Sequence, residues 1–166
     1  MAKEIERKFL VNRALWKPSG EGVVIRQGYL SLDPERTVRV RIKGERGFLT
    51  IKGKNHGISR TELEYEIPAA EAVQLLDELC LRPLVEKTRY VELYKGQQWE
   101  IDIFAGDNEG LAVAEAELTS EEDRLVLPDW AGREVSDDVR YYNSSLIHNP
   151  YKNWGLSQKL IDKGAL

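Results

Sequence analysis

The chain has 166 residues, of which 42% are hydrophobic and 31% are charged, a composition typical of a soluble globular protein with one core. Its 24 basic and 28 acidic side chains give a net charge of −4, which argues against a general nucleic-acid binder, because such proteins normally carry a basic excess. The single cysteine, Cys80, excludes an intrachain disulfide and a cysteine zinc cluster; with no signal-peptide pattern and no membrane-length apolar segment, we expect a cytoplasmic protein without membrane association.

Alternation of apolar and polar residues predicts a series of β-strands that begins close to the first residue. Turn residues such as Asp33-Pro34 and Lys95-Gly96 separate many of these strands, so that neighbours are expected to pair as antiparallel hairpins. The predicted strands are Glu4–Val11, Val23–Ser31, Thr37–Lys43, Gly47–Lys52, Arg60–Ile67, Glu86–Leu93, Gln98–Phe104 and Leu111–Leu118.

Helices are predicted in three places. Ala69–Leu81 carries apolar residues at helical spacing, and Thr119 or Ser120 is expected to cap a second helix that ends before Pro128. The tail, 138–160, is predicted to form short helical turns packed outside the sheet. These helices are too few for alternating βαβ units, so the expected fold class is mainly β and antiparallel.

Charged side chains share one face of most of the predicted strands, because residues two apart in a strand point the same way. One such strand is typical of the wet face of an open sheet, and that alternative holds for any strand taken alone. Over six strands, however, acidic and basic residues are segregated, which favours a closed barrel with a charged interior. The aligned sets are Glu4, Glu6 and Lys8; Arg39, Arg41 and Lys43; Arg60, Glu62, Glu64 and Glu66; Lys87 and Arg89; Glu100 and Asp102; and Glu115 and Glu117.

Such an interior needs ligands of both charges. Two like charges about 4 Å apart repel by roughly 4 kcal/mol at an effective dielectric constant of 20. A polyanion beside the basic strands and a divalent cation beside the acidic strands would relieve both repulsions. Hard cations prefer carboxylate oxygens and bridge to substrate phosphates, so a phosphate compound with Mg²⁺ or Mn²⁺ is predicted.

The order of motifs resembles the CYTH, or triphosphate tunnel metalloenzyme, superfamily. The opening Glu4-Ile5-Glu6-Arg7-Lys8 is similar to the ExExK motif of that family. The resemblance continues over nearly the whole chain and is closest to compact bacterial members that hydrolyse inorganic triphosphate. The further matching segments are Arg26-Gln27-Gly28-Tyr29-Leu30, Arg39-Val40-Arg41, Leu49-Thr50-Ile51-Lys52, 60–67, Glu86-Lys87-Thr88-Arg89-Tyr90, 100–104, Ala114-Glu115-Ala116-Glu117-Leu118 and Arg140-Tyr141-Tyr142-Asn143.

The resemblance implies one domain over residues 1–166, an eight-stranded antiparallel closed β-barrel tunnel that grips a triphosphate. The metal ligands that it implies are Glu4, Glu6, Asp102, Glu115 and Glu117. The phosphate contacts that it implies are Lys8, Arg39, Arg41, Lys52, Arg60, Lys87, Arg89 and, near the tunnel mouth, Arg133. Tyr29, Glu62 and Glu64 are expected to line the tunnel. The residues expected to carry catalysis are Glu4, Glu6, Lys8, Lys87, Glu115 and Glu117.

The sequence does not determine which triphosphate compound is the substrate. Adenylate cyclase, thiamine triphosphatase and RNA 5′-triphosphatase activities occur in the same superfamily and share the triphosphate grip. A non-catalytic polyphosphate or nucleotide sensor and an open-sheet interaction domain are further alternatives. Inorganic triphosphate is favoured because the chain is compact. No nucleic-acid partner is expected, and the sequence leaves open whether the protein is a monomer or a homodimer.

Overall fold

The structure, a computed structural model, describes residues 3–162, so the outermost residues of the predicted domain 1–166 lie outside it. Nine strands form one antiparallel sheet within this range. All eight predicted strands are present, with ends that differ from the prediction by at most one residue. The strands are β1 (Lys3–Val11), β2 (Val23–Ser31), β3 (Arg36–Lys43), β4 (Arg46–Gly53), β5 (Ser59–Ile67), β6 (Val85–Tyr94), β7 (Gln97–Phe104), β8 (Ala112–Glu117) and β9 (Ala131–Glu134).

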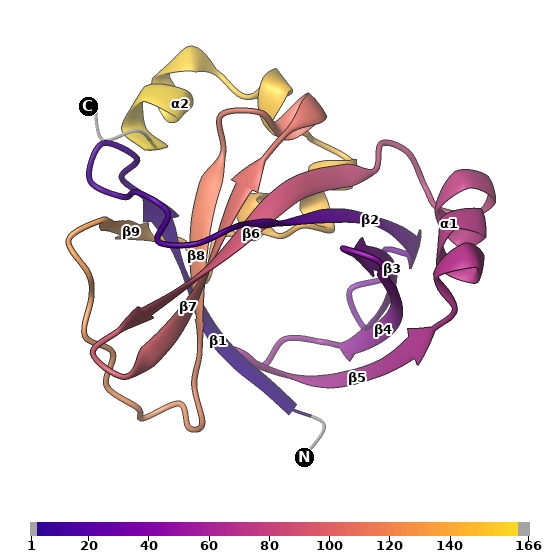
Figure 1. The fold of residues 1–166 in the computed structure, drawn as a ribbon, viewed down its shortest axis with the longest axis horizontal. Helices are drawn as coiled ribbons and strands as arrows, with labels where there is room; N and C mark the ends of the chain where they lie inside the picture. Colours follow the sequence, from indigo (N-terminus) through magenta and orange to yellow (C-terminus); the bar gives the residue numbers. More distant parts are fainter. Residues whose placement is uncertain (1–2, 163–166) are drawn as a thin grey trace.

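The sheet closes on itself (Figure 1). Its strands follow the order β5-β4-β3-β2-β6-β7-β8-β1, and β1 then pairs with β5. The closing contact is short, with Lys3 opposite Thr61, Glu4 opposite Arg60 and Ile5 opposite Ser59. The predicted eight-stranded antiparallel barrel is therefore confirmed.

The ninth strand, β9, is not predicted from the sequence. Its residues, Ala131–Glu134, show no apolar alternation, and only Ala131 is partly buried. It forms because the edge of β1 beyond the β5 contact is free: Val11 pairs with Ala131 and Phe9 with Glu134. An ion pair of 2.6 Å between Arg7 and Glu134 fixes it there.

The helix α1 (Ala69–Glu78) covers the outside of β3 and β4 (Figure 1). It begins where predicted and ends before Leu81. Its buried Ala72 and Leu76 pack against Val40 in a cluster that also contains Cys80. The helix predicted from Thr119 or Ser120 is wrong.

That segment is a turn, in which the carboxylate of Asp123 bonds the backbone of its own segment, a local arrangement that competes with a helix. Asp123 accepts hydrogen bonds from the backbone nitrogens of Thr119 at 2.9 Å and Ser120 at 3.1 Å. The chain then runs without regular structure to β9, and Leu125 packs on the outer face of β1, β7 and β8.

The tail forms helical turns, as predicted: η2 (Val139–Tyr141), η3 (Ser145–Ile147), η4 (Tyr151–Asn153) and α2 (Leu156–Asp162). It does not lie wholly outside the sheet. Tyr141, Leu146 and Tyr151 form one cluster with Leu10 and Val85, which share strand faces with Lys8 and Lys87. The tail therefore fills one end of the barrel with apolar side chains. No helix within residues 3–162 is long and apolar enough to cross a membrane.

Candidate active site

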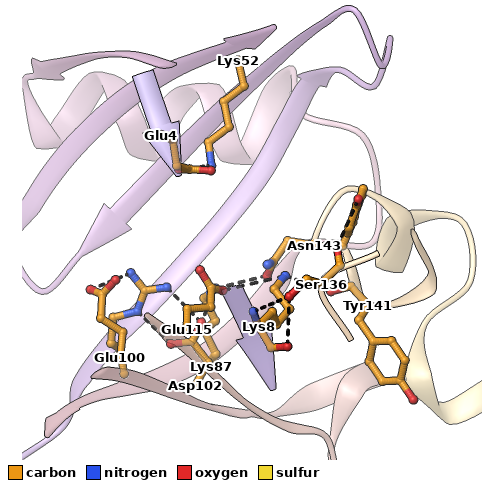
Figure 2. Close-up of polar contacts among 12 residues, drawn as sticks. Glu4, Lys8, Lys52, Lys87, Glu100, Asp102, Glu115, Ser136, Tyr141 and Asn143 are labelled. Atoms are coloured by element: carbon orange, nitrogen blue, oxygen red, sulfur yellow. Dashed lines mark hydrogen bonds and ion pairs between the residues drawn. The ribbon is translucent and has the colours of Figure 1, made fainter. Parts of the chain in front are cut away.

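A cavity of about 240 Å³ occupies the charged part of the barrel interior. It is lined from every strand of the closed ring, because the period of two in each strand turns its charged face inward. Figure 2 shows two groups of polar contacts in it, with the Glu4–Lys52 pair lying apart from a cluster around Lys8, Lys87 and Glu115. The predicted site residues that line the cavity are Glu4, Glu6, Lys8, Tyr29, Arg39, Arg41, Lys52, Arg60, Glu62, Glu64, Lys87, Arg89, Glu115 and Glu117.

Two predicted site residues lie elsewhere. Asp102 is 1% exposed and sits below the cavity surface, where Lys87 and Arg89 take up its two oxygens. Arg133 is on β9, its side chain is 44% exposed, and it donates to the hydroxyl of Tyr141. In this structure neither residue is placed to contact a ligand in the cavity.

The cavity also contains residues that were not predicted as site residues. Lys43 and Glu100 line it, and both belong to charged strand faces that the sequence already displays. Ser136 and the segment from Tyr142 to Ser144 reach it from the irregular tail. The only sequence signal for the latter is the Arg140–Asn143 motif, which names a segment without showing that it enters the barrel.

The basic wall is built by β3. The guanidinium groups of Arg39 and Arg41 share one carboxylate, that of Glu64, at 3.6 and 3.4 Å. Burial, together with the charges of Arg39 and Arg89, lowers the pKa of Arg41 to about 10. Arg41 therefore remains charged near neutral pH but is underpaired, as expected of a group whose counter-ion is a ligand.

A second cluster joins β1, β4 and β5. Glu4 lies 2.9 Å from the Lys52 ammonium and 3.6 Å from Arg60, and Lys52 also lies 3.2 Å from Glu62. Burial alone would raise the pKa of Glu4, but the hydrogen bond with Glu62 and the charges of Lys52 and Arg60 hold it below its ordinary value. Burial and the hydrogen bond with Glu4 raise the pKa of Glu62 to about 7.

The third cluster joins β6 and β7. Lys87 lies 2.7 Å from Asp102 and donates to the side-chain oxygen of Asn143 at 3.1 Å. Arg89 holds the same Asp102 through bonds of 2.8 and 2.9 Å. Burial lowers the pKa of Lys87 to about 8, although the charge of Asp102 acts in the opposite direction. Burial alone would raise the pKa of Asp102, but the charges of Lys87 and Arg89 lower it to about 2. Asp102 thus holds both cations, and Figure 2 shows it beside Lys87.

The acidic wall is formed by β1, β7 and β8. Glu6 lies directly opposite Glu117, and Glu100 directly opposite Glu115, although like charges in register destabilise a sheet. Burial and the charges of Glu115 and Glu4 raise the pKa of Glu6 well above its ordinary value. Burial and the charges of Glu4 and Glu100 also raise the pKa of Glu117.

These carboxylates match the donor chemistry of a divalent metal site. Lys8 pairs with Glu115, and Lys52 with Glu4, whereas Glu6 and Glu117 form no ion pair within residues 3–162. A hard cation would neutralise the charge that now favours protonation of Glu6. In the described range no three acidic, histidine or cysteine side chains already converge on one point. A metal here would therefore be bound by protein carboxylates and substrate oxygens together, as Mg²⁺ usually is in proteins.

The raised pKa values predict how the metal-free protein responds to pH. The folded state binds more protons than the unfolded state between the ordinary carboxyl pKa of 4.5 and the folded value of about 7 for Glu62. Its free energy of unfolding should therefore fall as the pH rises through this window. Melting temperatures measured in a chelator should be higher at about pH 5 than at about pH 8.

The variant Glu62→Gln is the direct check on this pH effect, since it removes one of the groups that take up the proton. We expect a smaller difference between the two melting temperatures in the variant than in the wild type. The exposed Glu66→Gln, on the same strand, is the control and should leave the difference unchanged. An equal difference in Glu62→Gln and the wild type would contradict the assignment.

Comparisons with known proteins agree with this geometry. The model of the CYTH domain family matches residues 2–148. An inorganic triphosphatase of Acetivibrio thermocellus is 51% identical over 93% of this chain and 99% of its own length. A second inorganic triphosphatase, from Nitrosomonas europaea, is 40% identical over 86% of this chain and 95% of its own length. A crystal structure of an inorganic triphosphatase superposes with a TM-score of 0.63 at 37% identity, over 89% of this chain and 95% of that one.

Proposed function

The chain belongs to the CYTH domain family, and from that premise we propose that it hydrolyses inorganic triphosphate to pyrophosphate and phosphate with a divalent metal ion, Mg²⁺ or Mn²⁺. The observation that carries the proposal is the segregation of charge inside one cavity. Arg39, Arg41 and Lys52 lie on strands β3 and β4, and Glu6, Glu115 and Glu117 lie on β1 and β8. A triphosphate needs the first group, and a metal bound to it needs the second.

The basic residues bind and orient the substrate. Arg39 and Arg41 present planar guanidinium groups suited to paired contacts with phosphate oxygens, whereas Lys8, Lys52 and Lys87 act as compact charges. Because these groups are already buried and held by neighbours, they lose little freedom when the substrate arrives. Their charge stabilises the negative charge that moves onto the leaving phosphate.

The carboxylates hold the metal and the water. Glu6, Glu115 and Glu117 would hold the ion, with Glu4 joining them if it leaves Lys52. When bound, the metal neutralises phosphate oxygens and lowers the pKa of a bound water. Burial and the hydrogen bond with Glu4 raise the pKa of Glu62 to about 7, so this carboxylate can accept a proton from the attacking water near neutral pH. Asp102 serves this site by holding Lys87 and Arg89, and Arg133 serves it only through Tyr141.

The proposal predicts a strict order in a substrate panel. Phosphate release from tripolyphosphate should require Mg²⁺ or Mn²⁺, stop when a chelator is added and exceed release from ATP, thiamine triphosphate and pyrophosphate. Pyrophosphate should be the poorest substrate, because it is too short to contact both the cations of β3 and β4 and the cluster around Lys87. Release of phosphate measured with each compound and each metal checks this, and an enzyme that prefers ATP would overturn it.

Adenylate cyclase activity is the second candidate, because it needs the same triphosphate grip. Formation of cyclic AMP from ATP in the same panel separates it from hydrolysis. A non-catalytic sensor would bind tripolyphosphate and release no phosphate with any metal. The acidic wall favours the enzyme, because a binding module for a polyanion gains nothing from carboxylates beside its ligand. We further propose that the protein acts in the cytoplasm as a single CYTH domain.

A further inference from the structure

Asp162, at the end of α2, is a buried carboxylate outside the triphosphate cavity. Its side chain is only 4% exposed. It accepts hydrogen bonds from the hydroxyl of Tyr141 at 2.6 Å, the amide of Gln158 at 2.9 Å and the hydroxyl of Tyr151 at 3.2 Å, and a guanidinium nitrogen of Arg133 lies 3.5 Å away. A carboxylate with so little exposed surface depends on such donors, so its neighbours must keep these positions.

The two tyrosines tie this carboxylate to the turns that close the barrel. The rings of Tyr141 and Tyr151 lie 5.0 and 4.9 Å from that of Trp154, and all three belong to the cluster that fills the barrel end. Burial and the adjacent charge of Asp162 raise the pKa of both hydroxyls, so both stay protonated and donate. Asp162 therefore fixes the turns η2 and η4 against α2.

The same turns touch the lysines of the cavity. The Lys8 ammonium donates to the backbone oxygen of Tyr141 at 3.3 Å and lies 5.8 Å from the ring centre of Tyr142. The Lys87 ammonium donates to the side-chain oxygen of Asn143 at 3.1 Å. Figure 2 shows the ring of Tyr141 pointing away from Lys8, while its backbone lies beside the lysine. One side of this short segment faces Asp162 and the other faces the proposed phosphate site.

We infer that Asp162 is a positioning residue for triphosphate hydrolysis. By holding the hydroxyl of Tyr141 it fixes the segment from Tyr141 to Asn143, whose Tyr141 carbonyl contacts the Lys8 ammonium and whose Asn143 side chain contacts the Lys87 ammonium. The inference rests on the proposed function of the cavity. Displacement of a substrate-positioning group by about 1 Å can slow a reaction about 100-fold, so a contact remote from the phosphates can control their binding.

The test compares two substitutions of Asp162 with a control. In Asp162→Ala the KM for tripolyphosphate should rise about tenfold, because Lys8 and Lys87 lose the positioning contacts with Tyr141 and Asn143, although Glu115 and Asp102 still pair with them. Asp162→Asn keeps an oxygen that accepts from Tyr141 and should restore KM to within about twofold of the wild type. Leu76→Ala empties buried space under α1, far from this segment, and should lower the melting temperature while leaving KM unchanged.

Each variant is assayed below its own melting temperature, with calorimetric tripolyphosphate binding as a second measurement. If Asp162→Ala does not fold, Tyr141→Phe removes the hydroxyl but keeps the ring, and it should raise KM and the dissociation constant for tripolyphosphate in the same direction. Wild-type KM in Asp162→Ala, or an equal rise in Leu76→Ala, would overturn the inference. If instead the wild type itself releases no phosphate, the proposed function has failed, and the dissociation constants alone decide the role of Asp162.

Discussion

The variant Glu6→Gln should lose at least about 100-fold in metal-dependent phosphate release from tripolyphosphate while keeping the fold. Glu6 lines the cavity and has no ion-pair partner within residues 3–162, so its ionised form would be balanced by a bound metal ion. Glutamine keeps the size of Glu6, and its amide can donate to Glu115, which shares a hydrogen bond with Glu6, but it cannot supply the negative charge. The measurement is the rate of phosphate release against metal concentration.

The thermal stability of Glu6→Gln separates loss of the site from loss of the fold. Burial and two neighbouring carboxylates raise the pKa of Glu6, so removing its charge should leave the melting temperature in a chelator unchanged or higher. Stabilisation by Mn²⁺, which the wild type should show, should disappear. Glu66→Gln, on the exposed part of β5, is the matched control and should retain activity. A fully active Glu6→Gln would remove Glu6 from the proposed site.

The second large effect is expected for Arg41→Gln, which should reduce activity at least about 100-fold and not destabilise the empty protein. Arg41 is 8% exposed, and burial and the charges of Arg39 and Arg89 lower its pKa to about 10. A lowered pKa means that the charged form is unfavourable in the folded state. Removing the charge of Arg41 should raise the free energy of unfolding by about 1–3 kcal/mol, and loss of the contact with Glu64 should offset part of this gain.

Activity and denaturant unfolding of the same preparation check this pair of effects. Arg46→Gln is the matched control and should leave activity intact, since Arg46 lies at the exposed rim of the barrel, where it pairs with Glu66 at 2.7 Å, and does not line the cavity. If Arg41→Gln is both inactive and strongly destabilised, the residue holds the fold together, and its role in phosphate binding is not supported.

The barrel and most of its lining could be predicted from the sequence because one local rule governs them. Residues two apart in a strand share a face, so Glu4, Glu6 and Lys8 had to point the same way whatever the tertiary structure. The alternation on the other strands then placed the remaining charges inside. The face on which a side chain lies does not depend on which strand pairs with which.

The exceptions depend on tertiary structure. Asp102 and Glu100 are two residues apart in β7 and therefore share a strand face. The strand face alone, however, does not show that Lys87 and Arg89 separate Asp102 from the cavity. The strand β9 exists because β1 offers it a free edge. The turn at Asp123 replaced a helix through hydrogen bonds of one side chain. None of these features has a periodic signature.

The part of the tail that enters the site also could not be predicted from the local sequence. Its composition predicts short helical turns, and these form, but nothing in the local sequence directs Asn143 to Lys87. That contact follows from apolar packing of Tyr141, Leu146 and Tyr151 into the end of the barrel. Long-range packing of this kind is visible only in the folded chain.

The most direct test of the account is a crystal structure of the protein with tripolyphosphate and Mn²⁺, with the metal located by its anomalous scattering. Phosphate groups should contact Arg39, Arg41 and Lys52, and a manganese peak should lie beside Glu6 and Glu117. Tripolyphosphate bound outside the barrel, or manganese bound away from these carboxylates, would contradict it.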